Sequence, residues 1–272
     1  MTKSLAAEAQ AAYVREQQGP AVVKSSEPMF NVPAVVLALL GLFVAIHVVR
    51  TYALTPDQDL QLLELFAFIP ARYDANLLLG GVGAEIWTFV TYALIHASAT
   101  HLAMNTVWFV PFGSAVARRF GAVRFLLFFS VTAAAGALAH LIAHPGEVFP
   151  VIGASASISG MMAGATRFAF QPKGPLATWQ AHNERSYHIP AVPLSEALRD
   201  ARVVIFLVVW FGLNFLFGFV GFPMTGTGQV VAWEAHIGGF VAGLFLFSLF
   251  DPVPTEYPPE DGTTREEESV GG

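Results

Sequence analysis

Long runs of residues without charge constrain the fold of this chain more than any other feature. The runs 32–49 and 203–220 contain no Asp, Glu, Lys or Arg. Only 12% of all residues are charged, against about 25% in an average soluble domain. A helix needs about 20 mainly apolar residues to cross a hydrocarbon layer of about 30 Å. The sequence therefore predicts an all-α polytopic membrane protein and excludes a soluble globular or disordered chain.

Six apolar segments approach this length, so we expect six transmembrane helices. The second begins only near His101, because polar residues interrupt the uncharged stretch before it, and a short interfacial segment precedes it. Residues 60–69 mix apolar side chains with charge, which favours a helix lying along the membrane surface. The predicted spans are 32–49, 101–117, 125–142, 148–166, 203–220 and 235–250.

Lys and Arg are distributed unevenly between the predicted loops, and this bias indicates orientation. Of the 14 in total, only Arg50 and Arg72 fall on one side of the membrane. We therefore expect both termini in the cytoplasm and a location in the bacterial inner membrane. The net charge of −6 provides no basic surface for nucleic acid. The absence of cysteine excludes disulfides and thiol catalysis.

Composition divides the chain into three parts. Residues 1–29 are mostly polar and form a predicted cytoplasmic tail, too long to be the short charged start of a signal peptide. Residues 30–250 form the predicted six-span membrane domain. Residues 251–272 are rich in Pro and Glu, which favours a disordered acidic cytoplasmic tail.

Polar side chains within a membrane span are costly and tend to be functional. His101 and Asn105 are spaced i, i+4, so they share one helix face near the outer end of the second span. Both can donate a side-chain hydrogen bond, either to a ligand or to the backbone of a neighbouring helix. His96 precedes the span and can be read as an interfacial residue.

The fourth and sixth predicted spans each begin with small residues and one side chain suited to catalysis. Ser155 follows Gly153, and His236 precedes Gly239 and Gly243. Glycines four residues apart let helices approach closely, so packing of these spans would bring Ser155 and His236 within hydrogen-bond distance. The alternative interpretation is that Ser155 is only a small residue that allows close helix packing. In α/β-hydrolases a Gly-x-Ser pattern lies at a turn between a strand and a helix. That context is missing here, so the pattern by itself does not identify a nucleophile.

A serine and a histidine in contact would permit acyl transfer. His236 would accept the Ser155 proton and later protonate the leaving amine. The side chains of His101 and Asn105, with the Ser155 backbone N–H, would donate to the oxyanion. Apart from Glu234, no carboxylate in the outer part of a span could orient the histidine, so we expect a dyad open to the outer aqueous face.

Taken together, these groups resemble, in order and spacing, the motifs of rhomboid intramembrane serine proteases over about residues 86–250. The resemblance implies a six-helix rhomboid-like bundle that lies among membrane lipids and cleaves transmembrane protein substrates near the outer face. It also implies Ser155 as nucleophile, His236 as base, and His101 with Asn105 as oxyanion donors. The motifs are His96-x4-His101-x3-Asn105, Gly153-x-Ser155-x4-Gly160 and Ala235-His236-x2-Gly239-x3-Gly243.

Four residues depart from the usual pattern of that family. Ala156 stands where Gly usually follows the nucleophile, and Ser159 replaces an aromatic residue. Thr88 replaces an Arg, and Ala117 replaces a Glu. The alternative hypothesis is therefore a catalytically inactive rhomboid-like protein that binds transmembrane helices.

A metal site is a further alternative. His140 and His144 have the i, i+4 spacing that suits zinc. The sequence contains no His-Glu-x-x-His motif, however, and shows no intramembrane carboxylate joining the two histidines. We expect them to be interfacial or helix-capping residues, and we expect neither a metal nor a cofactor.

Overall fold

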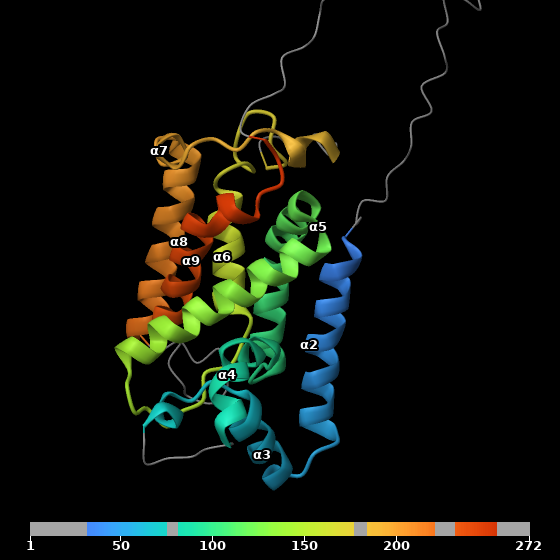
Figure 1. The fold of residues 1–272 in the computed structure, drawn as a ribbon, viewed down its shortest axis with the longest axis vertical. Coiled ribbons are helices and arrows are strands. Elements are labelled where there is room, and N and C mark those ends of the chain that lie inside the picture. The colour runs from blue at the N-terminus through green and yellow to red at the C-terminus, as the bar shows by residue number, and fades with distance from the viewer. Residues whose placement is uncertain (1–31, 75–80, 177–183, 221–231, 255–272) are drawn as a thin grey trace, which may run out of the picture. The chain divides into compact units, whose positions relative to one another are not determined.

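The computed structural model describes residues 32–74, 81–176, 184–220 and 232–254 (Figure 1). Within these ranges the chain is helical, and its β pairing is an isolated antiparallel bridge between Phe68 and Val151. The predicted all-α class is confirmed. The predicted N-terminal tail lies outside the described residues, as does the predicted C-terminal tail beyond residue 254.

Within the described ranges, three helices are long and apolar enough to cross a membrane, namely α2, α5 and α9, and α8 contains a shorter apolar stretch at Ala201–Leu216. The protein is thus an integral membrane protein, while the number of six spans stays a prediction. The helices are α2 (Ala34–Tyr52), α3 (Pro56–Phe66), α4 (Gly81–Thr91), α5 (Ala99–Ala143), α6 (Ser155–Ala165), α7 (Leu194–Ala197), α8 (Ala201–Val220) and α9 (Trp233–Phe250). Short 3-10 turns occur at η1 (Pro70–Tyr73), η2 (Tyr92–Leu94) and η3 (Glu184–His188).

Helix α5 contains two of the predicted spans without a loop between them. Its backbone leaves helical geometry at Gly121, with φ 74° and ψ 166°. Glycine adopts this conformation without the steric penalty that a Cβ would bring. Figure 1 shows the chain reversing direction there. Three arginines between the second and third predicted spans lie in the two helical halves of α5, with Arg118 and Arg119 before Gly121 and Arg124 after it.

Helix α3 begins earlier than the predicted surface segment 60–69. Thr55 caps its first turn by accepting a hydrogen bond from the Gln58 backbone N–H, and the Gln58 side chain accepts one from the Thr55 N–H. Pro56 at the first helical position adds to this capping box. The helix ends at Phe66, because the chain becomes extended at Ala67.

Helix α6 begins at Ser155, not at residue 148 as predicted for the fourth span. Pro150 cannot donate a backbone hydrogen bond, and Val151 pairs with Phe68 in the isolated bridge. Gly153 has a φ of 122°, which is far from helical values. These features delay the start of the helix to Ser155, the residue that the sequence identified as the candidate nucleophile.

Helix α6 packs against both α5 and α9 through small residues. A Cβ added at Gly239 would lie 2.1 Å from the carbonyl oxygen of Ala156, and one at Gly243 would lie 2.2 Å from that of Gly160. The predicted close packing of these glycines is therefore confirmed. The Ala156 methyl faces Gly136 of α5, where a Cβ would lie 2.5 Å from it. Glycine on α5 thus makes room for the alanine on α6.

A buried ion pair joins the C-terminal end of α9 to α5. Asp251 accepts hydrogen bonds of 2.9 and 2.8 Å from the Arg119 guanidinium. Arg119 also donates to the carbonyl oxygens of Tyr187 and Ile189, at 2.8 and 2.9 Å. Its guanidinium carbon lies 4.6 Å from the centre of the Phe168 ring. The Arg119 side chain is fully buried, and each of its three guanidinium nitrogens donates at least one hydrogen bond.

Candidate active site

A cavity of about 940 Å³ lies among α5, α6, α8 and α9. The four residues predicted to form the site, Ser155, His236, His101 and Asn105, all line it. Ser155 is the first residue of α6, and His236 lies in the first turn of α9. The close packing of α6 and α9 therefore places both side chains at the same end of the two helices.

The side chains of Ser155 and His236 are in direct contact. Nε2 of His236 lies 2.7 Å from Oγ of Ser155, which is the distance of a short hydrogen bond. At this distance an unprotonated Nε2 can accept the hydroxyl proton as the oxygen attacks. The contact depends on Gly239, since a larger residue there would push α9 away from α6.

Asn214 of α8 holds the other nitrogen of the same imidazole. Its Oδ1 lies 2.6 Å from Nδ1 of His236, and its Nδ2 donates to the Trp210 carbonyl oxygen at 2.8 Å. An amide oxygen only accepts, so the proton of the neutral ring resides on Nδ1 and leaves Nε2 free to accept from Ser155.

Sequence reasoning missed Asn214 and considered only Glu234 as a partner for the histidine. Glu234 turns away from His236, and its Oε1 lies 3.0 Å from Nε2 of His144. A signal for Asn214 was present, because it is a strongly polar residue within the uncharged run 203–220. The serine–histidine dyad itself stays a prediction, and the residue bonded to Nδ1 of its histidine is an amide and not a carboxylate.

Nε2 of His101 and Oγ of Ser155 both lie beside Gly153. Nδ1 of His101 accepts a hydrogen bond of 3.3 Å from the Ala97 backbone N–H, so the neutral ring carries its proton on Nε2. A Cβ at Gly153 would lie 2.8 Å from this Nε2 and 3.7 Å from Oγ of Ser155. Glycine at this position therefore lets an N–H donor approach the serine.

Asn105 lies one turn further along the same face of α5. Its Nδ2 donates to the His101 carbonyl oxygen at 2.9 Å, and one amide hydrogen remains for another acceptor. Its Oδ1 has no hydrogen-bond partner among the described residues. His96 is buried and stacks edge-on against His101, with ring centres 5.3 Å apart, but it does not line the cavity. His96 is therefore buried inside the protein and does not face solvent or lipid.

The remaining departures from the family pattern are accommodated locally. Ser159 donates to the Ser155 carbonyl oxygen at 2.8 Å, where an aromatic ring is usual. Thr88 is buried and bonds the Ala84 carbonyl oxygen of its own helix. Ala117 packs in the hydrophobic core. None of them enters the contact between the serine and the histidine.

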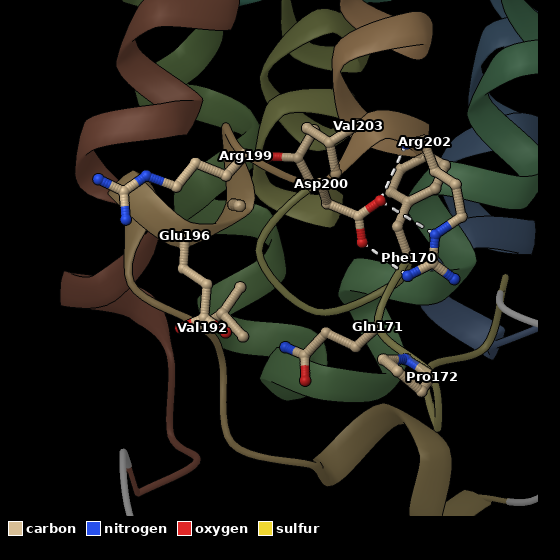
Figure 2. A pocket seen from close by; sticks show the side chains of 11 residues that line it. Phe170, Gln171, Pro172, Val192, Glu196, Arg199, Asp200, Arg202 and Val203 are labelled. Atoms are coloured by element: carbon tan, nitrogen blue, oxygen red, sulfur yellow. Dashed lines mark hydrogen bonds and ion pairs between the residues drawn. The ribbon is translucent and has the colours of Figure 1, made fainter.

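A second cavity, of about 430 Å³, lies at the opposite end of α6, beside α7 and the start of α8 (Figure 2). The Asp200 carboxylate there faces the Arg202 guanidinium at 2.6 Å. Hydrogen bonds from Arg202 lower the pKa of the Asp200 carboxyl. The described residues around this cavity include no histidine, so it offers no imidazole base. The candidate active site is therefore the larger cavity.

The fold and the cavity together define an integral membrane protein with a serine–histidine pair among its helices. The Rhomboid domain matches residues 83–251, and the chain belongs to the rhomboid family.

Two relatives are named as rhomboid proteases. Rhomboid protease GluP of Bacillus subtilis is 24% identical over 204 residues, which cover 75% of this chain and 33% of the relative. Rhomboid protease GlpG of Haemophilus influenzae is 31% identical over 77 residues, which cover 26% of this chain and 40% of the relative. The chain therefore matches less than half the length of either protein.

Proposed function

We propose that the protein is an intramembrane serine endopeptidase that cleaves transmembrane protein substrates near the outer face of the bacterial inner membrane, with both termini in the cytoplasm. The observation that carries this proposal is the 2.7 Å contact between Ser155 Oγ and His236 Nε2 in a cavity between apolar helices. Membership of the rhomboid family supports the same reaction class, because its matched relatives are named proteases.

The reaction begins when Ser155 Oγ attacks the scissile carbonyl carbon while His236 Nε2 takes the hydroxyl proton. The tetrahedral intermediate collapses, the C–N bond breaks, and His236 gives the proton to the leaving amine. A water molecule, deprotonated by His236, then hydrolyses the acyl-enzyme. Oδ1 of Asn214 accepts a hydrogen bond from Nδ1–H of His236 throughout and so keeps the ring in the correct tautomer.

In the proposed reaction, three groups donate hydrogen bonds to the oxygen on which negative charge develops. They are the Nε2–H of His101, the amide hydrogen that Asn105 does not use within its helix, and the backbone N–H of Ser155. No side chain caps α6 at Ala154, so the N–H groups of its first turn remain for a ligand. One side-chain donor of this kind contributes about 2.7–4 kcal/mol to transition-state stabilisation.

A transmembrane substrate must unwind locally before its carbonyl can reach Ser155. Inside a bilayer each freed backbone group needs a hydrogen-bond partner, which the polar lining of the cavity supplies. We therefore expect substrates whose membrane span contains small or helix-destabilising residues at the cleavage site. This expectation concerns a class of sequence and not an individual substrate.

The test is cleavage of a fluorogenic transmembrane substrate by the purified protein in bicelles, with labelling by a serine-directed fluorophosphonate. We expect Ser155→Ala and His236→Ala each to lower the rate by about 10⁴-fold or more, since the two groups act as a unit. Ser157→Ala is the matched control. Ser157 lies on the same helix, but its hydroxyl donates to the Phe129 carbonyl oxygen and does not line the cavity.

Two outcomes would contradict the proposal. Absence of cleavage and of labelling in the wild type would favour the alternative, a catalytically inactive rhomboid-like protein that binds transmembrane helices. Cleavage unchanged in Ser155→Ala would exclude this serine as the nucleophile.

A further inference from the structure

Four titratable side chains that the proposed reaction does not use gather at the edge of the same cavity. His140 and His144 lie at the C-terminal end of α5, Glu147 lies in the turn after it, and Glu234 lies in the first turn of α9. The prediction that no carboxylate joins the two histidines is wrong. The first turn of α9 packs against the end of α5 and brings Glu234 to them.

Glu234 faces one edge of both imidazoles. Its Oε1 lies 3.0 Å from Nε2 of His144, and its Oε2 lies 3.8 Å from Nδ1 of His140. One ligand atom from each of the three residues can be chosen so that all lie within 4.8 Å of one another. Tetrahedral zinc with bonds of about 2.0–2.2 Å separates neighbouring ligand atoms by about 3.4 Å. Small side-chain rotations would therefore close these three groups around one ion.

Glu147 faces the opposite edge of the same two rings. Its Oε2 lies 3.4 Å from Nε2 of His140 and 3.5 Å from Nδ1 of His144. In protein metal sites the ring nitrogen that does not bind the metal commonly donates its hydrogen to a carboxylate, which fixes the tautomer and the ring direction. Glu234 and Glu147 thus have the positions expected of a ligand and of the carboxylate that orients the ligands.

The most buried residue of the cluster, His140, lacks the hydrogen bonds that its burial requires. His140 is only 5% exposed, and neither of its ring nitrogens has a hydrogen-bond partner among the described residues. The same is true of the Oε2 atom of Glu147. Unpartnered buried groups of this kind are unfavourable and need an explanation. A bound dication would coordinate the histidine and balance the two carboxylate charges.

We propose that His140, His144 and Glu234 bind one zinc ion, with Glu147 as the residue that orients the imidazoles. Two imidazoles and one carboxylate suit zinc, whereas calcium and magnesium prefer oxygen ligands throughout. Three protein ligands leave a fourth position for water. The ion would link the end of α5 to the start of α9, two residues before His236, and so stabilise the position of the helix that carries the proposed base.

Zinc binding can be tested separately from proteolysis. The full chain, without a histidine tag, would be stripped with a chelator in detergent and titrated with zinc chloride, while bound metal and thermal unfolding are measured. We expect about one zinc per chain and a rise in the unfolding midpoint. Magnesium chloride at the same concentration should produce neither effect.

Variants identify the ligands. His144→Ala and Glu234→Gln should abolish stoichiometric binding, and both are suitable because the His144 side chain is 40% exposed and Gln preserves the shape of Glu. Glu147→Gln should weaken binding by about 10- to 100-fold. His47→Ala is the control, because this histidine lies on α2 near His96 and away from the cluster. Absence of zinc from the wild type, or zinc retained in both ligand variants, would overturn the proposal.

Discussion

The two ends of α9 are both joined to α5 by polar side chains, yet they differ in how completely those side chains are bonded. At the C-terminal end, Arg119 donates to Asp251 and to two backbone carbonyl oxygens while fully buried. At the N-terminal end, Glu234 and His140 line an open cavity, and the ring nitrogens of His140 have no hydrogen-bond partner in the described part of the chain. A completed network serves stability, whereas an incomplete one leaves groups available for a substrate, water or an ion.

The largest loss of stability should follow from breaking the completed network. Asp251→Asn would leave the buried Arg119 charge unpaired, and we expect the free energy of unfolding to fall by about 3–5 kcal/mol. Unfolding in detergent, followed by circular dichroism, measures this. At temperatures below the midpoint, fluorophosphonate labelling of Ser155 should persist.

The control for this prediction is Asp200→Asn. In the ion pair of Asp200 with Arg202, the Arg202 side chain is exposed and the Asp200 side chain is partly exposed, so its loss should cost less than about 1 kcal/mol. Equal losses in the two variants would show that burial does not distinguish these ion pairs.

An intermediate effect is expected from Gly239→Ala. The new methyl group would collide with the Ala156 carbonyl oxygen, and overpacking of this kind costs about 1–3 kcal/mol. Because the collision also separates α9 from α6, the labelling rate of Ser155 should fall together with the unfolding midpoint. Gly41→Ala is the matched control. Nothing lies within 4 Å of a Cβ at Gly41, so alanine there should be neutral or stabilising. A normal labelling rate in Gly239→Ala would contradict the role of this close contact.

The smallest effect on stability is expected from Asn214→Ala, because water in the cavity can replace the amide oxygen as the acceptor for Nδ1 of His236, although activity should change clearly. A hydrogen bond to a group that becomes charged is worth about 1.5–3 kcal/mol, so kcat should fall by about 10- to 150-fold while KM stays unchanged. Asn214→Asp keeps an acceptor oxygen near Nδ1 of His236 and should restore part of the rate. If KM rises and kcat is unchanged, Asn214 does not position the histidine.

Much of the fold could be predicted because uncharged runs of membrane-spanning length leave few alternatives. The helices α2, α8 and α9 lie close to the predicted spans. The start of α6 could not be predicted from hydrophobicity, since it depends on Pro150, on the conformation of Gly153 and on pairing with the distant Phe68.

In the site, too, some contacts can be predicted from local sequence spacing, and others depend on the tertiary fold. The proximity of Ser155 and His236 could be inferred, because Gly239 and Gly243 specify which faces of the two helices meet. The contact between His144 and Glu234 joins residues 90 positions apart, and no local spacing encodes it. The contact of Asn214 with His236 likewise depends on how α8 is rotated about its own axis. The almost uniformly apolar sequence of α8 does not determine this rotation.

The isolated bridge at Phe68 and Val151 has a consequence for motion near the nucleophile. Two further backbone hydrogen bonds, from Ala71 to the Glu147 carbonyl oxygen and from Gly153 to that of Tyr92, fasten the same extended segment. Any loosening of the segment before Ser155 must therefore break its bonds to Phe68, which follows α3, and to residues of η1 and η2. Opening on this side would be a concerted event involving several parts of the chain, and it would be slow compared with the fluctuation of a free surface loop.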